Sequence, residues 1–135
     1  MAKQQDKVRK SPQEWAEQLD PATYKVTREK GTEPPFSGEY DNCDKEGTYT
    51  CSCCGQPLFS SDSKFDAGCG WPSFNQALNE EAVDEAKDFS HFMIRTEILC
   101  SRCDAHLGHV FKDGPEPTGL RYCVNSVSLK LEEKE

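Results

Sequence analysis

The residues with the most chemistry to offer in this chain are its eight cysteines, because four of them form two Cys-x-x-Cys pairs. Cys51 and Cys54 make the first pair, and Cys100 and Cys103 make the second. This spacing lets two thiolates from one tight turn reach a single ion at about 2.3 Å. We therefore expect one structural Zn²⁺ bound by all four thiolates, which would tie two distant hairpins together.

The alternative for such a pair is a thioredoxin-like redox site, but that motif needs a βαβ context that this part of the sequence does not offer. Cys53 lies inside the first pair. We treat it as a neighbouring free thiol, because the spacing of Cys51 and Cys54 matches that of the second pair.

Two further cysteines lie in unusual surroundings. Cys69 is flanked by glycines, which let the backbone turn sharply and bring the thiol to the surface. Cys123 lies in a β-like run in which Arg121 and Asn125 project from the same face, at intervals of about 6.6 Å. These three side chains are expected to line one pocket, where the guanidinium favours the thiolate. Cys123 taken alone could equally be a small buried apolar residue.

Residue types alone leave several other candidates open. His106 and His109 have a spacing that suits metal binding, a turn or acid–base catalysis. Trp71 suits a core as well as a pocket, and Asp113, which precedes Gly-Pro, suits a turn.

Length and charge narrow the function classes. The chain has 135 residues and a formal net charge of −8, so we expect one domain over residues 11–135 and no nucleic-acid partner. There is no apolar run of the roughly 18 residues that a membrane span needs. Residues 1–10 are polar and are expected to form a flexible tail. We expect a soluble, cytoplasmic protein without a membrane partner.

The expected elements are short. Residues 12–19 and 21–30 carry helix signals, the first with Ser11 as N-cap and Glu14 three residues later. From residue 38 to 131, short β-rich runs alternate with turn residues, most clearly over 91–99 and 120–131, and predict antiparallel sheet.

One acidic segment breaks this β pattern. Residues 74–87 are expected to form a solvated loop or a short helix, with the acidic residues there and Asp88 serving solubility. In the run 91–99, one face carries Ile94 and Ile98, and we expect one of the two faces to be core.

Taken together, the motifs resemble the methionine-(R)-sulfoxide reductases of the B type, over residues 11–130. The resemblance rests on the two cysteine pairs and on four further motifs in this order, which are Gly31-Thr32-Glu33-Pro34-Pro35-Phe36, Gly68-Cys69-Gly70-Trp71-Pro72-Ser73-Phe74, His106-Leu107-Gly108-His109-Val110-Phe111 and Arg121-Tyr122-Cys123-Val124-Asn125-Ser126. It implies a mainly β, tent-like fold of two antiparallel sheets stapled by zinc, with short N-terminal helices. Cys43 and Cys53 lie outside these motifs and are assigned no role.

The resemblance also implies a reaction, the repair of oxidised proteins by reduction of the R epimer of methionine sulfoxide. Cys123 would be the nucleophile and become a sulfenic acid, which Cys69 would convert to a disulfide that thioredoxin reduces. Trp71 and Phe111 would contact the substrate. The remaining catalytic residues implied by the resemblance are His106, His109, Asn125, Arg121 and Asp113, the last of which would orient an imidazole.

Two other classes remain open beside this enzyme. A zinc-ribbon interaction module would explain the two cysteine pairs and little else. A zinc-stapled chaperone or exchange-factor-like domain could share the fold without the Cys123 chemistry. For the enzyme we expect a monomer that uses oxidised proteins and thioredoxin as partners.

Overall fold

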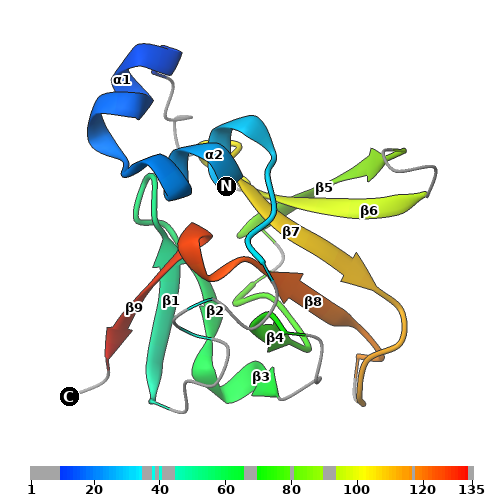
Figure 1. The fold of residues 1–135 in the computed structure, drawn as a ribbon. Helices are drawn as coiled ribbons and strands as arrows, with labels where there is room; N and C mark the ends of the chain where they lie inside the picture. Colours follow the sequence, from blue (N-terminus) through cyan, green and yellow to red (C-terminus); the bar gives the residue numbers. More distant parts are fainter. Residues whose placement is uncertain are drawn as a thin grey trace.

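The computed structural model describes residues 10–34, 38, 40, 45–65, 70–79, 81–89, 94–116 and 118–133. Within these residues the protein is mainly β, with two antiparallel sheets and two short α-helices near the N-terminus, as predicted. The helices lie at one end of the molecule, and the strand pair β5 (Val83–Asp88) and β6 (Arg95–Cys100) extends outward at one side (Figure 1). The predicted tail lies outside the described residues except for Lys10.

The first helix begins at the predicted cap Ser11, and the second begins at a side-chain cap on Asp20. In α1 (Pro12–Gln18), the Ser11 hydroxyl accepts from the Glu14 backbone N–H, and the Glu14 carboxylate accepts from the Ser11 N–H at 2.8 Å. In α2 (Pro21–Glu29), the Asp20 carboxylate accepts from the Thr23 N–H at 2.9 Å. These bonds satisfy backbone donors that a helix leaves free in its first turn.

The strands divide into a small and a large sheet. In spatial order, the small sheet contains β2 (Pro57–Ser60), β1 (Gly47–Cys51) and β9 (Leu129–Glu133). In the same way, the large sheet contains β3 (Lys64–Phe65), β4 (Ser73–Phe74), β8 (Arg121–Val124), β7 (His106–Phe111), β6 (Arg95–Cys100) and β5 (Val83–Asp88). Two 3₁₀ turns, η1 (Ser61–Ser63) and η3 (Ser126–Ser128), join strands.

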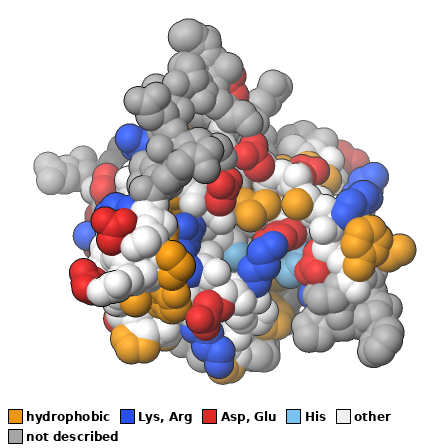
Figure 2. Space-filling model, turned by 90° about the horizontal axis from the view of Figure 1, so that it is seen from above, with side chains coloured by type: hydrophobic (Ala, Val, Ile, Leu, Met, Phe, Trp, Pro, Cys, Tyr) orange, Lys and Arg blue, Asp and Glu red, His pale blue; other side chains and the backbone are white. Residues whose placement is uncertain are grey.

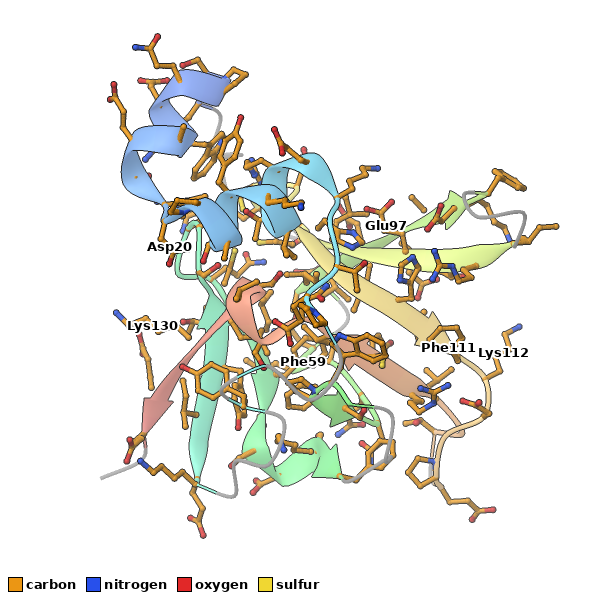
Figure 3. The ribbon with its side chains drawn as sticks, in the orientation of Figure 1. Asp20, Phe59, Glu97, Phe111, Lys112 and Lys130 are labelled. Atoms are coloured by element: carbon orange, nitrogen blue, oxygen red, sulfur yellow. The ribbon has the colours of Figure 1, made fainter. Side chains whose placement is uncertain are left out.

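The core is built around aromatic rings that join the two sheets. Phe59 of β2 stacks on Phe74 of β4 with ring centroids 4.5 Å apart, and Tyr49 of β1 meets Phe74 edge-on at 5.2 Å. All three rings are fully buried, and Figure 3 shows Phe59 in the interior of the molecule. Since burying a large apolar side chain contributes about 1.5–3 kcal/mol, this cluster fixes one sheet against the other.

The β-rich run over residues 120–131 forms two strands, because the chain leaves the large sheet after β8 and enters the small sheet as β9. The 3₁₀ turn η3 makes the change of sheet, and its end is held by a hydrogen bond from the Ser128 N–H to the Asn125 carbonyl. A single alternating pattern conceals such a turn, since both halves read as strand.

The prediction of a loop or short helix over residues 74–87 holds for the turns at 75–79 and 81–82 but is wrong for the residues after them. Residues 83–88 form the edge strand β5, which pairs with β6 over its full length, from Val83 opposite Cys100 to Asp88 opposite Arg95. The run 91–99 was predicted to bury one face, and here the outcome is mixed. Ile98 is buried, but Ile94 is 72% exposed and Glu97 on the other face is 3% exposed. Among the described residues, no helix is long and apolar enough to cross a bilayer.

Candidate active site

One face of the large sheet carries a cavity of about 320 Å³. The residues that line it come from the segment after α2, from β6, β7 and β8, and from the loops around them. They are Thr32, Trp71, Arg95, Gly108, His109, Phe111, Arg121, Cys123 and Asn125. From above, histidine side chains are visible between basic and acidic side chains near the middle of the molecule (Figure 2).

Strand register explains why these residues meet. In the antiparallel pair β7–β8, His109 lies opposite Cys123 and Phe111 lies opposite Arg121. Residues that face each other across an antiparallel pair project from the same side of the sheet. Together with Asn125, which follows β8, Arg121 and Cys123 line the cavity, so the prediction that these three residues share one pocket is confirmed.

The Cys123 thiol has a basic neighbour. The Arg121 Nη1 lies 3.7 Å from the Cys123 Sγ, within reach of a hydrogen bond to sulfur. The guanidinium is held on its other side by the Asp113 carboxylate, through Nε at 2.8 Å and Nη2 at 3.1 Å, and it lies 4.6 Å from the centre of the Phe111 ring. A positive group this close to the sulfur favours the thiolate form.

Asp113 does not orient an imidazole, and that prediction is wrong. Its hydrogen bond to Arg121 lowers the pKa of the carboxyl below its usual value. The bidentate geometry keeps the guanidinium in place over Phe111 and beside Cys123. The hairpin that joins β7 to β8 brings Asp113 and Arg121 together. The spacing of Asp113 from His109 along the chain did not indicate this contact.

The two histidines occupy different surroundings. His109 lines the cavity, and its Nε2 lies 2.7 Å from the Asp88 Oδ2. His106 is buried outside the lining of the cavity, and its Nδ1 lies 2.7 Å from the Glu97 Oε2. The two rings are 5.6 Å apart in an edge-on arrangement. Burial lowers the pKa of His106, although the hydrogen bond to Glu97 opposes this effect.

Sequence reasoning missed both carboxylates. Asp88 was assigned to solubility, and that interpretation is wrong because it binds His109 and also contacts Arg95 at 3.3 Å. Glu97 is buried between His106 and Lys30, whose Nζ lies 3.1 Å away. Figure 3 shows Glu97 in the region between α2 and the β6–β7 strands, and Phe111 near the tip of β7. In the sequence, the alternation of side chains along residues 91–99 was the signal that could have indicated that Glu97 is buried.

The segment after α2 orients two pocket residues through Glu33. The Trp71 indole N–H donates to the Glu33 carbonyl at 3.0 Å, and the Glu33 N–H donates to the Asn125 Oδ1 at 3.0 Å. The Glu33 carboxylate is buried and accepts from the Val127 N–H at 3.1 Å. Glu33 lies in one of the sequence motifs but had no role predicted for it. Its backbone accounts for the position of both the Trp71 ring and the Asn125 amide.

The Asn125 amide is oriented from both ends. Its Nδ2 donates to the Leu107 carbonyl at 3.1 Å, while its Oδ1 accepts from Glu33. An amide nitrogen carries two hydrogens, so one N–H remains for a ligand in the cavity. Cys69 and Cys43 lie outside the described residues, so the structure does not place the predicted second redox cysteine.

The four cysteines of the two pairs come together, as predicted. The Sγ atoms of Cys51, Cys54, Cys100 and Cys103 all lie within 4.8 Å of one another, and the Cys51–Cys103 and Cys54–Cys100 sulfur distances are both 3.6 Å. A tetrahedron with arms of about 2.3 Å has edges of about 3.8 Å. The cluster therefore has the size of a tetrathiolate metal shell.

The two turns that carry the cysteine pairs have similar backbone conformations. Gly55 and Asp104, which follow the second cysteine of each pair, both have positive φ, at 82° and 62°. The Gly55 N–H donates to the Cys51 carbonyl at 2.9 Å, and the Asp104 N–H donates to the Cys100 carbonyl at 2.8 Å. Each turn thus presents its two sulfurs in the same way to a shared centre.

Donors directed at sulfur also fit a thiolate cluster. The Arg28 Nη2 lies 3.7 Å from the Cys103 Sγ, the Gln56 Nε2 lies 3.6 Å from the Cys100 Sγ, and the Cys53 N–H points to the Cys51 Sγ at 3.4 Å. Hydrogen bonds to ligand sulfurs stabilise their negative charge. Cys53 contributes this backbone contact and is outside the set of four.

Comparisons with known proteins agree with this geometry. Residues 19–133 match a family model described as the SelR domain. The chain is 60% identical over 129 residues to a peptide methionine sulfoxide reductase MsrB of Acinetobacter baylyi, covering 96% of this chain and 93% of that protein. It is 62% identical over 126 residues to the protein of the same name from Hahella chejuensis, covering 93% of this chain and 91% of that one. The range matched by the family model contains every cavity and cluster residue described above.

Proposed function

This chain belongs to the SelR-domain family of peptide methionine sulfoxide reductases, and from this premise we propose that it reduces the R epimer of methionine sulfoxide in oxidised proteins. The observation that carries the proposal is the position of Cys123, which lies in a cavity beside Arg121, His109 and Asn125. These residues supply a nucleophile, a positive neighbour for it and hydrogen-bonding groups in one place.

The first step is attack of the Cys123 thiolate on the sulfoxide sulfur. A sulfoxide sulfur is a poor electrophile until its oxygen is hydrogen-bonded or protonated, so a donor is needed at the oxygen. The oxygen is transferred to Cys123 together with one proton, methionine leaves, and the cysteine becomes a sulfenic acid. The cysteine is oxidised by two electrons and the sulfoxide is reduced by two.

The second step regenerates the enzyme. The Cys69 thiol attacks the sulfenic acid of Cys123, a disulfide forms and water leaves. Thioredoxin then reduces this disulfide by dithiol exchange, so it is the proposed partner. Because this cycle depends on a dithiol reductant, we place the enzyme in the reducing cytoplasm, where it acts as a monomer on oxidised proteins.

The other cavity residues bind and orient the substrate. Trp71, held by its hydrogen bond to Glu33, provides an apolar wall for the S-methyl group. Phe111 of β7 lies directly opposite Arg121 of β8. Asn125 lines the cavity with one amide hydrogen uncommitted to the backbone and is the proposed donor to the sulfoxide oxygen, and His109 lines the cavity on the neighbouring strand. Arg121 stabilises the Cys123 thiolate.

We further propose that Cys51, Cys54, Cys100 and Cys103 hold one Zn²⁺ with a structural role. Four thiolates complete a tetrahedral shell, so such an ion stabilises the fold and takes no part in the reaction. The turns that carry these cysteines follow β1 and β6, so the ion joins the two sheets.

Stereospecific turnover tests the proposal. A peptide with R-methionine sulfoxide should be reduced in the presence of dithiothreitol, whereas its S epimer should stay unreduced, as measured by chromatography of the peptide. Cys123→Ser should abolish reduction, and Cys53→Ser, which changes a thiol outside the cavity, should retain it. Equal turnover of both epimers, or activity in the Cys123→Ser protein, would refute the proposal.

A further inference from the structure

The two neighbouring histidines bond to carboxylates through different ring nitrogens. His109 uses Nε2 toward Asp88, and His106 uses Nδ1 toward Glu97, each at 2.7 Å. The carboxylates come from two different strands, β6, which pairs with β7, and β5, which lies on the far side of β6. Each histidine therefore has its own carboxylate partner.

An ionised carboxylate only accepts hydrogen bonds, so the ring nitrogen that faces it carries a hydrogen. In a neutral imidazole, the other nitrogen is then an acceptor without a hydrogen. We propose that Asp88 and Glu97 are positioning residues that hold His109 and His106 in opposite tautomers, with the hydrogen on Nε2 of His109 and on Nδ1 of His106. The proposal concerns the site itself, and only its consequence for catalysis rests on the proposed function.

Each carboxylate also contacts a base that balances its charge. The Arg95 Nη2 lies 3.3 Å from the same Asp88 oxygen that meets His109, and the Lys30 Nζ lies 3.1 Å from the other Glu97 oxygen. A buried carboxylate is retained in a fold when it is paired and hydrogen-bonded. The two His–carboxylate–base groups are thus built alike, although their residues come from different elements.

The arrangement distinguishes the roles of the two rings. His109 lies opposite Cys123 in the β7–β8 pair and lines the cavity, so with Nε2 committed to Asp88 its Nδ1 is the ring nitrogen left for a substrate. His106 is buried and does not line the cavity. Asp88 therefore acts on the reaction through His109, while Glu97 fixes the ring behind it.

Nitrogen-15 NMR of the imidazole rings tests the tautomers directly. The chain has three histidines, so His106→Gln and His109→Gln spectra assign the ring signals in the full-length reduced protein. At pH 9, well above the usual pKa of about 6.5 for histidine, two-bond proton–nitrogen correlations distinguish the tautomers. We expect the Nε2–H form for His109 and the Nδ1–H form for His106. The same tautomer in both rings would overturn the proposal.

Variants of Asp88 give the second readout. Asp88→Leu, which removes the acceptor, should abolish the fixed Nε2–H signature of His109 and slow single-turnover sulfoxide reduction about 10- to 100-fold, by analogy with the loss of a carboxylate that orients a metal-bound histidine. Asp88→Glu, which can still accept, should retain the signature and recover part of the rate. Glu85→Gln removes a charge from an exposed position on β5 and should change neither. An unchanged His109 tautomer in Asp88→Leu would refute the role of Asp88.

The two proposals fail in different ways. If the wild-type tautomers are as stated but no methionine sulfoxide is reduced, the proposed function fails and the positioning role of the carboxylates stands. If the enzyme is active and both rings share one tautomer, only the positioning role fails. The wild-type spectrum needs no substitution at Asp88, so the test holds even where Asp88→Leu does not fold.

Discussion

Replacing one cluster cysteine should remove both the metal and much of the stability of the fold. Cys103→Ser replaces one of the four sulfurs that lie within 4.8 Å of one another, and a hydroxyl is a poor ligand for zinc beside three thiolates. Cys53→Ser is the matched control, because it changes a buried thiol in the same turn that is outside the set of four. Its backbone N–H, which contacts the Cys51 Sγ, is unchanged by the substitution.

The size of the effect follows from the loop that the cluster closes. Cys54 and Cys100 are 46 residues apart. Treating the metal as a cross-link, the loss of chain entropy on closing such a loop corresponds to about 4 kcal/mol at 25 °C. That is a large share of the roughly 5–15 kcal/mol by which a domain is stable. For 135 residues, with an unfolding entropy of about 280 cal/mol/K, it corresponds to a fall in Tm of about 14 °C.

Metal analysis and thermal unfolding should be measured on the same samples. Zinc content by mass spectrometry should be one per chain in the wild-type and Cys53→Ser proteins, and near zero in Cys103→Ser. Circular dichroism should show the loss of about 14 °C in Cys103→Ser, and a change of about 2 °C or less in the control. A Cys103→Ser protein that retains its zinc and its Tm would refute the reasoning. Zinc loss in Cys53→Ser would show that the ligand set is wrong.

Three further outcomes are expected. Cys69→Ser should reduce about one sulfoxide per chain in a quenched single turnover and fail to recycle with thioredoxin, because attack by Cys123 precedes disulfide formation; loss of the first turnover would contradict this order. Gly108→Ala should destabilise the protein by about 1–3 kcal/mol in urea unfolding, since the added Cβ would overlap the backbone carbonyl of Cys123 on β8, and a protein of unchanged stability would show that the strands can separate freely. Burial lowers the pKa of His106 below its usual value of 6.5. As the pH falls below 6.5, the unfolded chain therefore binds a proton at this residue while the folded chain does not, so the free energy of unfolding decreases with falling pH. His106→Gln should make this decline shallower by up to about 1.4 kcal/mol per pH unit, as measured by urea unfolding from pH 7 to 5.5. The same slope of unfolding free energy against pH in both proteins would argue against the burial effect.

Local patterns in the sequence determined several features of this protein. The helix starts follow from Ser11 and Asp20, because a cap and its partner are only three residues apart. The cysteine cluster was predictable because each Cys-x-x-Cys pair forms within one turn. The shared pocket of Arg121, Cys123 and Asn125 follows from the alternation of side chains along a strand. In each case the relevant geometry is contained in a few consecutive residues.

Only the tertiary structure decided which residues from distant parts of the chain contact one another. Asp88 is in an acidic segment that resembles a solvated loop, and its strand exists because β5 pairs with β6 through backbone hydrogen bonds that are indifferent to charge. That pairing brings Asp88 to His109, and the β7–β8 hairpin brings Asp113 to Arg121. Glu33 reaches Trp71 and Asn125 through its backbone, which carries no sequence signal. Contacts between residues far apart in the chain depend on strand register, and register is set by the packing of the whole domain.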